Sequence, residues 1–207
     1  DGVSGTYVST PDSVANSTRQ SIVIEVDAAL DWTTTNKTIL SKYNSSLAER
    51  AYRLYIYPGA TPRFAFAGSE DGAIVLTYTQ PIPASWADYS RHTIKVEFDA
   101  VNHLITFYLD GVAQTPIATS LSSLADFDTP LEIGSLNGGG SQNIEGKIYS
   151  TTVTKGPTPE PYVLLDGVAG TYVSTPDSAA NSITGNITVE LDIAAADWSP
   201  ASGQVVI

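Results

Sequence analysis

Hydrophobic and polar residues alternate along several short segments of this chain. Over 21–27 every second residue is apolar, and the same pattern returns over 92–99 and 103–109. Because successive side chains of a β-strand point to opposite faces, such alternation is typical of a strand with one buried and one solvated face. The residues expected to point inward are Ile22, Ile24, Val26, Ile94, Val96, Phe98, Ile105, Phe107 and Leu109.

Further β-prone runs, rich in Ile, Leu, Tyr and Phe, are separated by turn-forming residues. Asp110 and Gly111 form one such turn, since both residue types tolerate the positive φ angles of a two-residue hairpin. No segment keeps a helical period, and 46–50 has room for one helical turn at most. The other predicted strands are 6–9, 37–43, 51–57, 63–67, 73–78, 130–134 and 144–153. This pattern predicts an all-β fold, a two-sheet antiparallel β-sandwich of the jelly-roll type.

The opening stretch of the sequence occurs twice. Residues 1–17 and 166–182 are identical at 15 of 17 positions and lie about 165 residues apart. That spacing is the size of a whole β-domain, which favours tandem copies of one module. We therefore expect a first repeat over 1–154, a proline-rich linker over 155–161, and the start of a second, incomplete repeat over 162–207. On this interpretation the sequence is part of a longer, repeat-bearing protein.

The composition limits the partners that the protein can have. It contains 22 acidic and 10 basic residues, a net charge of −12, and nucleic acids and anionic membranes are bound by clustered Lys and Arg, so neither is expected as a partner. The lack of cysteine excludes disulfides, thiolate zinc sites and cysteine nucleophiles. No run of roughly 18 apolar residues occurs, so no membrane insertion is expected. This polar composition is common in extracellular, cell-surface and virion proteins, and we expect one of these locations.

A series of motifs in the first repeat follows a known order. Trp86 precedes RHTIKVEFD at 91–99, and then come FYLDG at 107–111, LEIG at 131–134 and IEGKI at 144–148. In this order and spacing the chain resembles laminin-G-like domains of the concanavalin A-like superfamily. The resemblance covers 5–154 and begins again at 171. It implies the same jelly-roll sandwich and, as in many members, a glycan or cell-surface ligand.

Part of that superfamily hydrolyses β-glucans with two glutamates and an aspartate spaced as E-x-D-x-x-E on one strand. Glu25 and Asp27 match the first half of this motif, but Leu30 stands where the second glutamate is required. Because the proton donor is missing, we expect Glu25 and Asp27 to be solvated strand residues and the protein not to be an enzyme. His92 and His103 lie at strand starts with no catalytic triad around them, so neither is expected to act in catalysis.

Sugar binding requires an aromatic face for the apolar side of a sugar ring, flanked by polar groups for its hydroxyls. Tyr55 and Tyr57 share one side of a predicted strand with Arg53 and could line a concave face. Trp86 is instead expected to pack in the core, if it follows the family position that it matches. The candidate carbohydrate-binding residues are Tyr55, Tyr57, Arg53, Trp86, Tyr89, Asn137 and Asn143.

The resemblance also makes calcium a candidate cofactor, because many family members hold this ion with loop carboxylates and carbonyls. The candidate ligands are Asp71, Asp126 and Asp128, with Asn137 and Asn143 as further oxygen donors, all in predicted loops. They lack the fixed spacing of a dedicated calcium loop. Solvated turn residues are the alternative interpretation.

Together these observations predict a non-enzymatic surface or virion structural module for adhesion or carbohydrate recognition, with a glycan or cell-surface ligand as its partner. One alternative is a purely architectural repeat, a spacer or assembly unit whose partners are neighbouring repeats or copies of itself. Another is the accessory binding domain of a larger carbohydrate-active enzyme.

Overall fold

A computed structural model of the protein describes residues 7–13, 16–32, 36–57 and 61–156. The chain divides into two units, Asp1–Glu160 and Pro161–Ile207. The predicted second repeat and most of the predicted linker lie outside the described residues, so the repeat organisation stays a prediction. No helix in the described part of the chain is long and apolar enough to cross a membrane.

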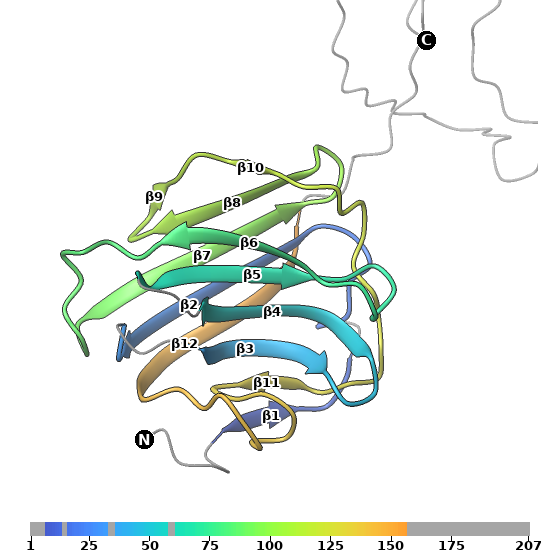
Figure 1. Ribbon diagram of the computed structural model, residues 1–207, viewed down its shortest axis with the longest axis horizontal. Helices are drawn as coiled ribbons and strands as arrows, with labels where there is room; N and C mark the ends of the chain where they lie inside the picture. The colour runs from blue at the N-terminus through green and yellow to red at the C-terminus, as the bar shows by residue number, and fades with distance from the viewer. Residues whose placement is uncertain (1–6, 14–15, 33–35, 58–60, 157–207) are drawn as a thin grey trace, which may run out of the picture. The chain divides into compact units, whose positions relative to one another are not determined.

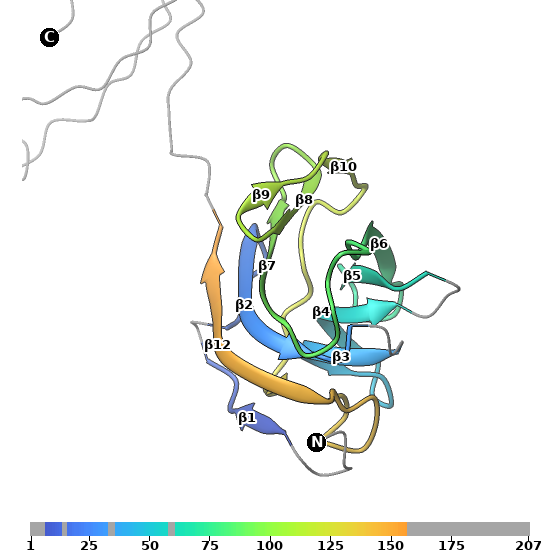
Figure 2. The ribbon, with the colours of Figure 1, turned by 90° about the vertical axis from the view of Figure 1, so that its left-hand side faces the viewer.

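The described residues fold into two antiparallel β-sheets of six strands each, which Figure 2 shows as separate layers. The first sheet has the order β1-β11-β3-β4-β5-β6, and the second has the order β10-β8-β7-β2-β12, with β9 paired to β8. The strands are β1 (Val8–Thr10), β2 (Ile22–Leu30), β3 (Lys37–Asn44), β4 (Glu49–Tyr57), β5 (Arg63–Gly68), β6 (Leu76–Pro81), β7 (Arg91–Asp99), β8 (Leu104–Leu109), β9 (Val112–Ala113), β10 (Ile117–Ala118), β11 (Leu131–Ile133) and β12 (Gly146–Lys155) (Figure 1). The predicted all-β sandwich is thus confirmed.

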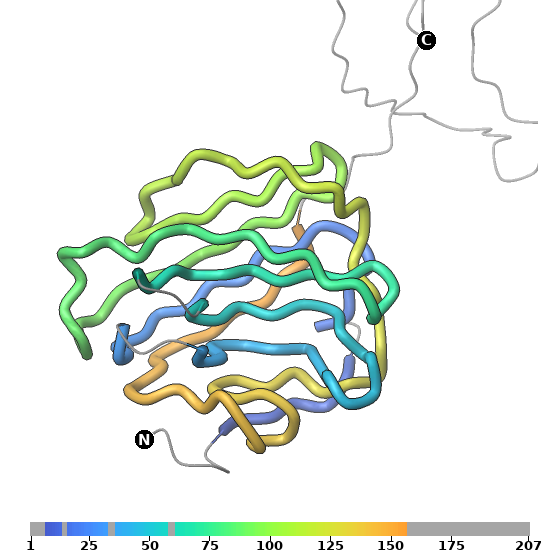
Figure 3. Tube along the Cα trace, viewed as in Figure 1, coloured from blue at the N-terminus to red at the C-terminus, as the bar shows by residue number. Residues whose placement is uncertain are grey.

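The path of the chain (Figure 3) alternates between the two sheets. It enters the second sheet with β2, builds the first with β3–β6, and returns to the second with β7–β10. The last two strands are then divided, β11 to the first sheet and β12 to the second. Strands far apart in sequence therefore become neighbours, as β2 does between β7 and β12.

The alternation of apolar and polar residues explains which side chains of the second sheet lie in the core. All nine residues predicted to point inward are buried, with exposed fractions of 6% or less. They face the inner side chains of the first sheet, among them Leu54, Phe64 and Phe66. Phe66 stacks on Phe98 of the opposite sheet, with ring centroids 6.2 Å apart. Burying one such side chain stabilises the fold by roughly 1.5–3 kcal/mol. The pattern of apolar residues therefore decides which face of each strand is buried.

Trp32 closes one end of this core. Its ring makes edge contacts with Phe64 and Trp86, at centroid distances of 5.9 and 5.3 Å, and its indole N–H donates to the Ser90 carbonyl at 3.0 Å. Trp86 packs against the core and stacks almost parallel on His92 at 3.7 Å. The expectation that Trp86 is a packing residue fits these contacts.

Some local details differ from the sequence prediction. Residues 45–48 form a turn, and Glu49, expected in a possible helical turn, instead begins β4. The two-residue strands β9 and β10 were not expected, since a strand that short has no periodicity to detect. The predicted hairpin turn is present: Asp110 and Gly111 have φ angles of 49° and 78° and join β8 to β9.

Candidate functional site

The outer face of the first sheet, away from the core, carries the aromatic and cationic residues that the sequence singled out. Arg53, Tyr55 and Tyr57 follow one another at alternate positions of β4, so all three lie on this face. The Arg53 guanidinium lies 3.9 Å from the centre of the Tyr55 ring. The Tyr55 and Tyr57 rings are 6.0 Å apart and tilted by 51°. We call these three residues the β4 platform.

The β4 platform is more buried than an open strand face would be. Arg53 and Tyr55 are only 8% and 7% exposed, whereas Tyr57 is 39% exposed. On the neighbouring strand β5, Ala65 and Ala67 pair with Tyr55 and Arg53 and are also buried. A strand with one buried and one solvated face would leave this outer face open to water. In the structure most of the face is covered, and the Tyr57 ring is the accessible part of the β4 platform.

The loop before β12 supplies one of the groups that cover this face. Gln142 accepts hydrogen bonds through its Oε1 from Arg53 Nη2 and from Thr38 Oγ1, and its carbonyl accepts the Thr38 N–H at 2.7 Å. Gln142 adopts a φ of 55°, which directs the loop back over β3. No pattern in the sequence points to Gln142, because its partners come from about 90 to 105 residues earlier in the chain.

Arg53 has hydrogen-bonding capacity to spare. Its Nε is buried and has no partner among the described residues, and a buried N–H without an acceptor is uncommon in folded proteins. Burial lowers the pKa of Arg53 to about 10, with the nearby tyrosines Tyr55 and Tyr43 acting in the opposite direction. The guanidinium is therefore still charged at neutral pH. An oxygen-rich group that reaches this position would gain a charge-assisted hydrogen bond.

Of the other candidate sugar-binding residues, Asn137 and Tyr89 have partners away from the β4 platform. The Asn137 side-chain amide donates to Ser45 Oγ at 2.8 Å, and its Oδ1 accepts the Ser45 N–H at 3.1 Å. Tyr89 is exposed, has a φ of 61°, and donates to Glu145 at 3.0 Å. Asn143 is buried beside Gln142 in sequence, and its Oδ1 has no partner among the described residues. The structure therefore brings together Arg53, Tyr55 and Tyr57, and places Trp86 at the core end described above.

Two of the three candidate calcium ligands line one pocket of about 290 Å³, together with Arg19, Glu70 and Phe127. Asp71 uses its Oδ1 to accept the backbone N–H groups of the next turn at 2.8 Å and the Ser69 hydroxyl at 3.2 Å. These hydrogen bonds lower the pKa of Asp71.

Asp126, the second of these ligands, lies 3.9 Å from the Arg19 guanidinium. Asp128 is not among the residues lining the pocket. Within 7–13, 16–32, 36–57 and 61–156, no group of three or more His, Asp or Glu side chains is placed to hold a metal ion.

Glu25 and Asp27 lie on the outer face of the second sheet. Glu25 is exposed, and Asp27 accepts a hydrogen bond from Arg91 Nε at 2.8 Å. This bond to Arg91 lowers the pKa of Asp27. Neither carboxylate has the partner glutamate that glycoside hydrolysis by this motif requires.

The prediction that the histidines have no triad-like partners is wrong for His92. Its Nε2 lies 2.7 Å from Ser90 Oγ, and its Nδ1 lies 2.8 Å from an Asp110 carboxylate oxygen. The Ser90 hydroxyl also donates to the Ala87 carbonyl, so it has a second partner besides His92. Asp110 also accepts the Thr93 N–H at 2.9 Å. These bonds tie the hairpin turn to the start of β7, which is a structural role.

Comparison with known proteins supports the fold. The sequence matches no protein family and no curated protein. The structure is similar to a heptameric SAP-like pentraxin from Limulus polyphemus, at a TM-score of 0.53 and 10% identity over 67% of this chain and 65% of that one. It is also similar to a putative carbohydrate-binding protein from Bacteroides ovatus, at a TM-score of 0.54 and 17% identity over 72% of this chain and 41% of the other.

A third similar structure is the CBM40 domain of a Ruminococcus gnavus sialidase bound to sialyllactose, at a TM-score of 0.50 and 14% identity, covering 78% and 92% of the two chains. This chain has a concanavalin A-like fold. This chain spans 65% of the pentraxin and 41% of the Bacteroides ovatus protein. At 10% and 17% sequence identity, the similarity shows the concanavalin A-like architecture alone.

Proposed function

We propose that the module is a non-enzymatic carbohydrate-binding domain of a surface-exposed protein, and that sugar binds at the β4 platform. The observation that carries this proposal is the stack of Arg53 on Tyr55, with the ring of Tyr57 accessible beside it. Tyr57 offers an accessible apolar ring face, and the charged Arg53 guanidinium lies on the same face of β4. The carbohydrate-binding names of two of the similar structures support the same class of ligand.

The finer points of this function are proposals too. The laminin-G-like relationship and an extracellular, cell-surface or virion location rest on the sequence motifs and composition. Calcium is a second proposal, for which the pocket lined by Asp71 and Asp126 is the site. Because Asp128 does not line this pocket, a loop carbonyl is the additional oxygen donor to examine there.

The experiment is a glycan-array screen of the 207-residue chain, run with calcium and again with a chelator. We expect binding that is indifferent to the chelator, followed by a loss of about tenfold or more in affinity on Tyr57→Ala, because a stacking ring is removed. Tyr149→Ala is the matched control: Tyr149 is 51% exposed and stacked by Arg91 at 4.1 Å, but it belongs to β12 of the second sheet.

Three results would contradict the β4 platform as the site. Equal affinity of Tyr57→Ala and the unchanged protein would remove Tyr57 from the site. A loss on Tyr149→Ala instead would move the site to the second sheet. Binding that the chelator abolishes would move it to the pocket at Asp71 and Asp126, where Asp71→Asn is the variant to test.

The architectural alternative is favoured by a separate observation, the repetition of residues 1–17. A folded chain that binds no glycan with or without calcium would support this assembly role. The third alternative, an accessory domain of a carbohydrate-active enzyme, depends on a catalytic domain beyond these residues.

A further inference from the structure

Basic residues are concentrated in the first sheet. β3 and β4 each contain two and β5 contains one, which together make five of the ten basic residues of the chain. These five are Lys37, Lys42, Arg50, Arg53 and Arg63. The same three strands contain one acidic residue, Glu49, although acidic residues outnumber basic ones by 22 to 10 in the whole chain. These strands therefore carry charge of the opposite sign to the protein as a whole.

The exposed cations on the outer faces of the two sheets differ in their partners. On the second sheet, Arg91 is paired with Asp27, and Lys95 Nζ lies 2.8 Å from Glu97, so each positive charge is balanced locally. On the first sheet, Arg63 forms no ion pair within the described part of the chain. Its contact is a weak hydrogen bond of 3.5 Å to the hydroxyl of Thr79 on β6. The charge of Arg63 is thus available to a ligand.

Arg63 lies beside the accessible ring of the β4 platform. It is the first residue of β5 and pairs directly with Tyr57, the last residue of β4 (Figure 1). Directly opposite residues of an antiparallel pair point to the same face, with Cβ atoms about 4.5–5.5 Å apart. Both side chains are exposed. A guanidinium and an aromatic ring therefore lie next to each other at the open end of this face.

Two further cations lie near this pair. Arg53 is on the same face of β4, and its guanidinium is charged at neutral pH, since burial lowers its pKa only to about 10. Lys37 begins β3 and pairs with Ile56, the neighbour of Tyr57, so it stands at the same end of the sheet. Both cations add to the attraction that an anion at Tyr57 would experience.

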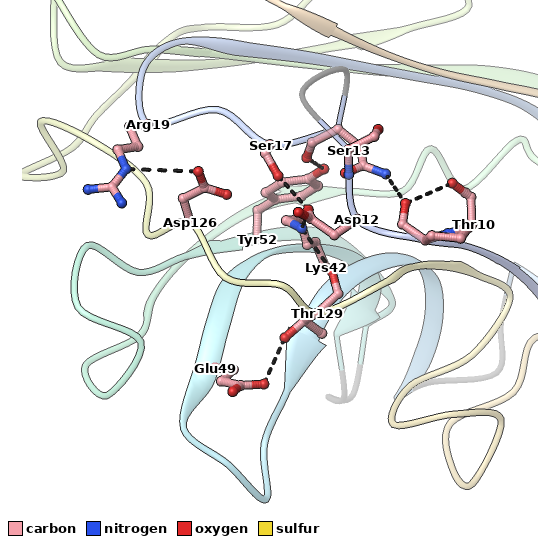
Figure 4. Close-up of polar contacts among 12 residues, drawn as sticks. Thr10, Asp12, Ser13, Ser17, Arg19, Lys42, Glu49, Tyr52, Asp126 and Thr129 are labelled. Carbon is pink, nitrogen blue, oxygen red and sulfur yellow. Dashed lines mark hydrogen bonds and ion pairs between the residues drawn. The ribbon is translucent and has the colours of Figure 1, made fainter.

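The two acidic residues of the first-sheet strands are distant from Arg63. Glu49 is at the opposite end of β4, eight residues or about 26 Å from Tyr57, and accepts the Thr129 hydroxyl at 3.0 Å (Figure 4). Glu132 belongs to β11, three strands or about 14 Å from β5, and it is buried and accepts the Ser135 hydroxyl. Both distances exceed the screening length of about 8 Å at physiological ionic strength. Neither carboxylate therefore neutralises Arg63.

We propose that the β4 platform takes glycans that carry an anionic group, a carboxylate or a sulfate, and that Arg63 binds this group while Tyr57 stacks on the sugar ring. The inference rests on the proposed function, because it names the class of sugar that the same platform binds. A guanidinium donates two parallel hydrogen bonds to the oxygens of a carboxylate or sulfate, which a neutral hydroxyl cannot match. Since a net charge of −12 repels anions elsewhere, binding of an anionic sugar is confined to this face.

The test is a glycan array that holds uronic-acid and sulfated oligosaccharides beside their neutral counterparts, the carboxyl-reduced and the desulfated forms. Each pair differs in charge at one position and shares the remaining sugar. We expect the 207-residue chain to bind the anionic member about tenfold more tightly than its neutral counterpart, because charge-assisted hydrogen bonds are gained. Comparing uronic-acid pairs with sulfated pairs shows which of the two anions Arg63 accepts.

Variants then connect this preference to Arg63. Arg63→Gln should lower the affinity for the anionic member about tenfold and leave the neutral counterpart unchanged, whereas Tyr57→Ala should weaken both. Arg63→Lys keeps the charge but not the two parallel donors, so it should retain part of the preference. Lys147→Gln is the matched control, because it removes the same charge from an exposed residue of β12 in the second sheet. It should leave every affinity unchanged.

Three results would overturn the inference. Equal affinity for the anionic and neutral members, with both weakened by Tyr57→Ala, would refute the anionic class and leave sugar binding at the platform intact. Equal losses on Arg63→Gln and Lys147→Gln would mean that the overall charge acts on the ligand and that Arg63 does not bind it. Binding to no member of the array would be the failure of the proposed function itself, and the choice of an anionic sugar would fall with it.

Discussion

Trp32 gives the most demanding test of the packing described above. It is buried, makes edge contacts with Phe64, Trp86 and His92, and donates its indole N–H to the Ser90 carbonyl. Trp32→Phe keeps a ring in the core but removes this hydrogen bond and leaves a small cavity. Trp32→Ala removes the ring as well, and with it all three aromatic contacts.

The expected losses follow from these contacts. An acceptor left without its donor costs about 1–3 kcal/mol, and the cavity left by the smaller ring adds roughly 1 kcal/mol. We therefore expect Trp32→Phe to lower the free energy of unfolding by about 3 kcal/mol, or Tm by roughly 6–12 °C for a domain of this size. Trp32→Ala should cost about 5 kcal/mol or more, since a whole buried aromatic side chain is lost.

Urea denaturation followed by far-ultraviolet circular dichroism measures both variants, with an unchanged m-value as the check that the folded state is intact. Trp86→Phe is the control, because Trp86 is only partly buried and should lose less. A loss below about 1 kcal/mol for Trp32→Phe would refute the argument that Trp32 closes the core through packing and its bond to Ser90.

Two further predictions concern pH and backbone geometry. Hydrogen bonds from basic side chains lower the pKa values of Asp12 and Asp27. The stability that these bonds contribute is therefore present above the unfolded pKa near 4 and is lost as pH falls through the folded pKa. Urea unfolding should show lower stability at pH 3 than at pH 7, and equal stability would contradict this. Gly146 has a φ of 128°, and an added Cβ would lie 2.2 Å from the Ala29 carbonyl oxygen, so Gly146→Ala should cost roughly 2 kcal/mol or more. Gly111→Asn, in open space at a φ that Asn tolerates, is its control in the same urea unfolding experiment.

The sequence by itself determined the longer strands and which face of β2, β7 and β8 is buried. Alternation at Ile22, Ile94 and Ile105 predicts which side of β2, β7 and β8 is buried, and the structure confirms it. This works because the period of a strand is a local property and the hydrophobic effect acts on each side chain in the same way. The same alternation also predicts that Arg53, Tyr55 and Tyr57 share a face of β4.

The burial of that face was decided by tertiary structure. Gln142 reaches Arg53 from a loop almost 90 residues later in the chain. The pattern of β4 gives no sign of this contact, because it depends on β11 and β12 being placed in opposite sheets. The small residues Ala65 and Ala67, which alternate with Phe64 and Phe66 along β5, are a local signal that the outer face of β5 is covered.

His92 and the ion pair of Asp12 with Lys42 show the same division. The sequence displays the repeat of Asp12 and Asn16, and it displays His92, but the partners of these residues lie elsewhere in the chain. Asp12 meets Lys42 from β3, and His92 meets Asp110 from the hairpin turn after β8. The role of a polar residue depends on which donor, acceptor or charge lies next to it in the folded protein. When that partner is distant in sequence, the two residues meet only once the sheets have formed.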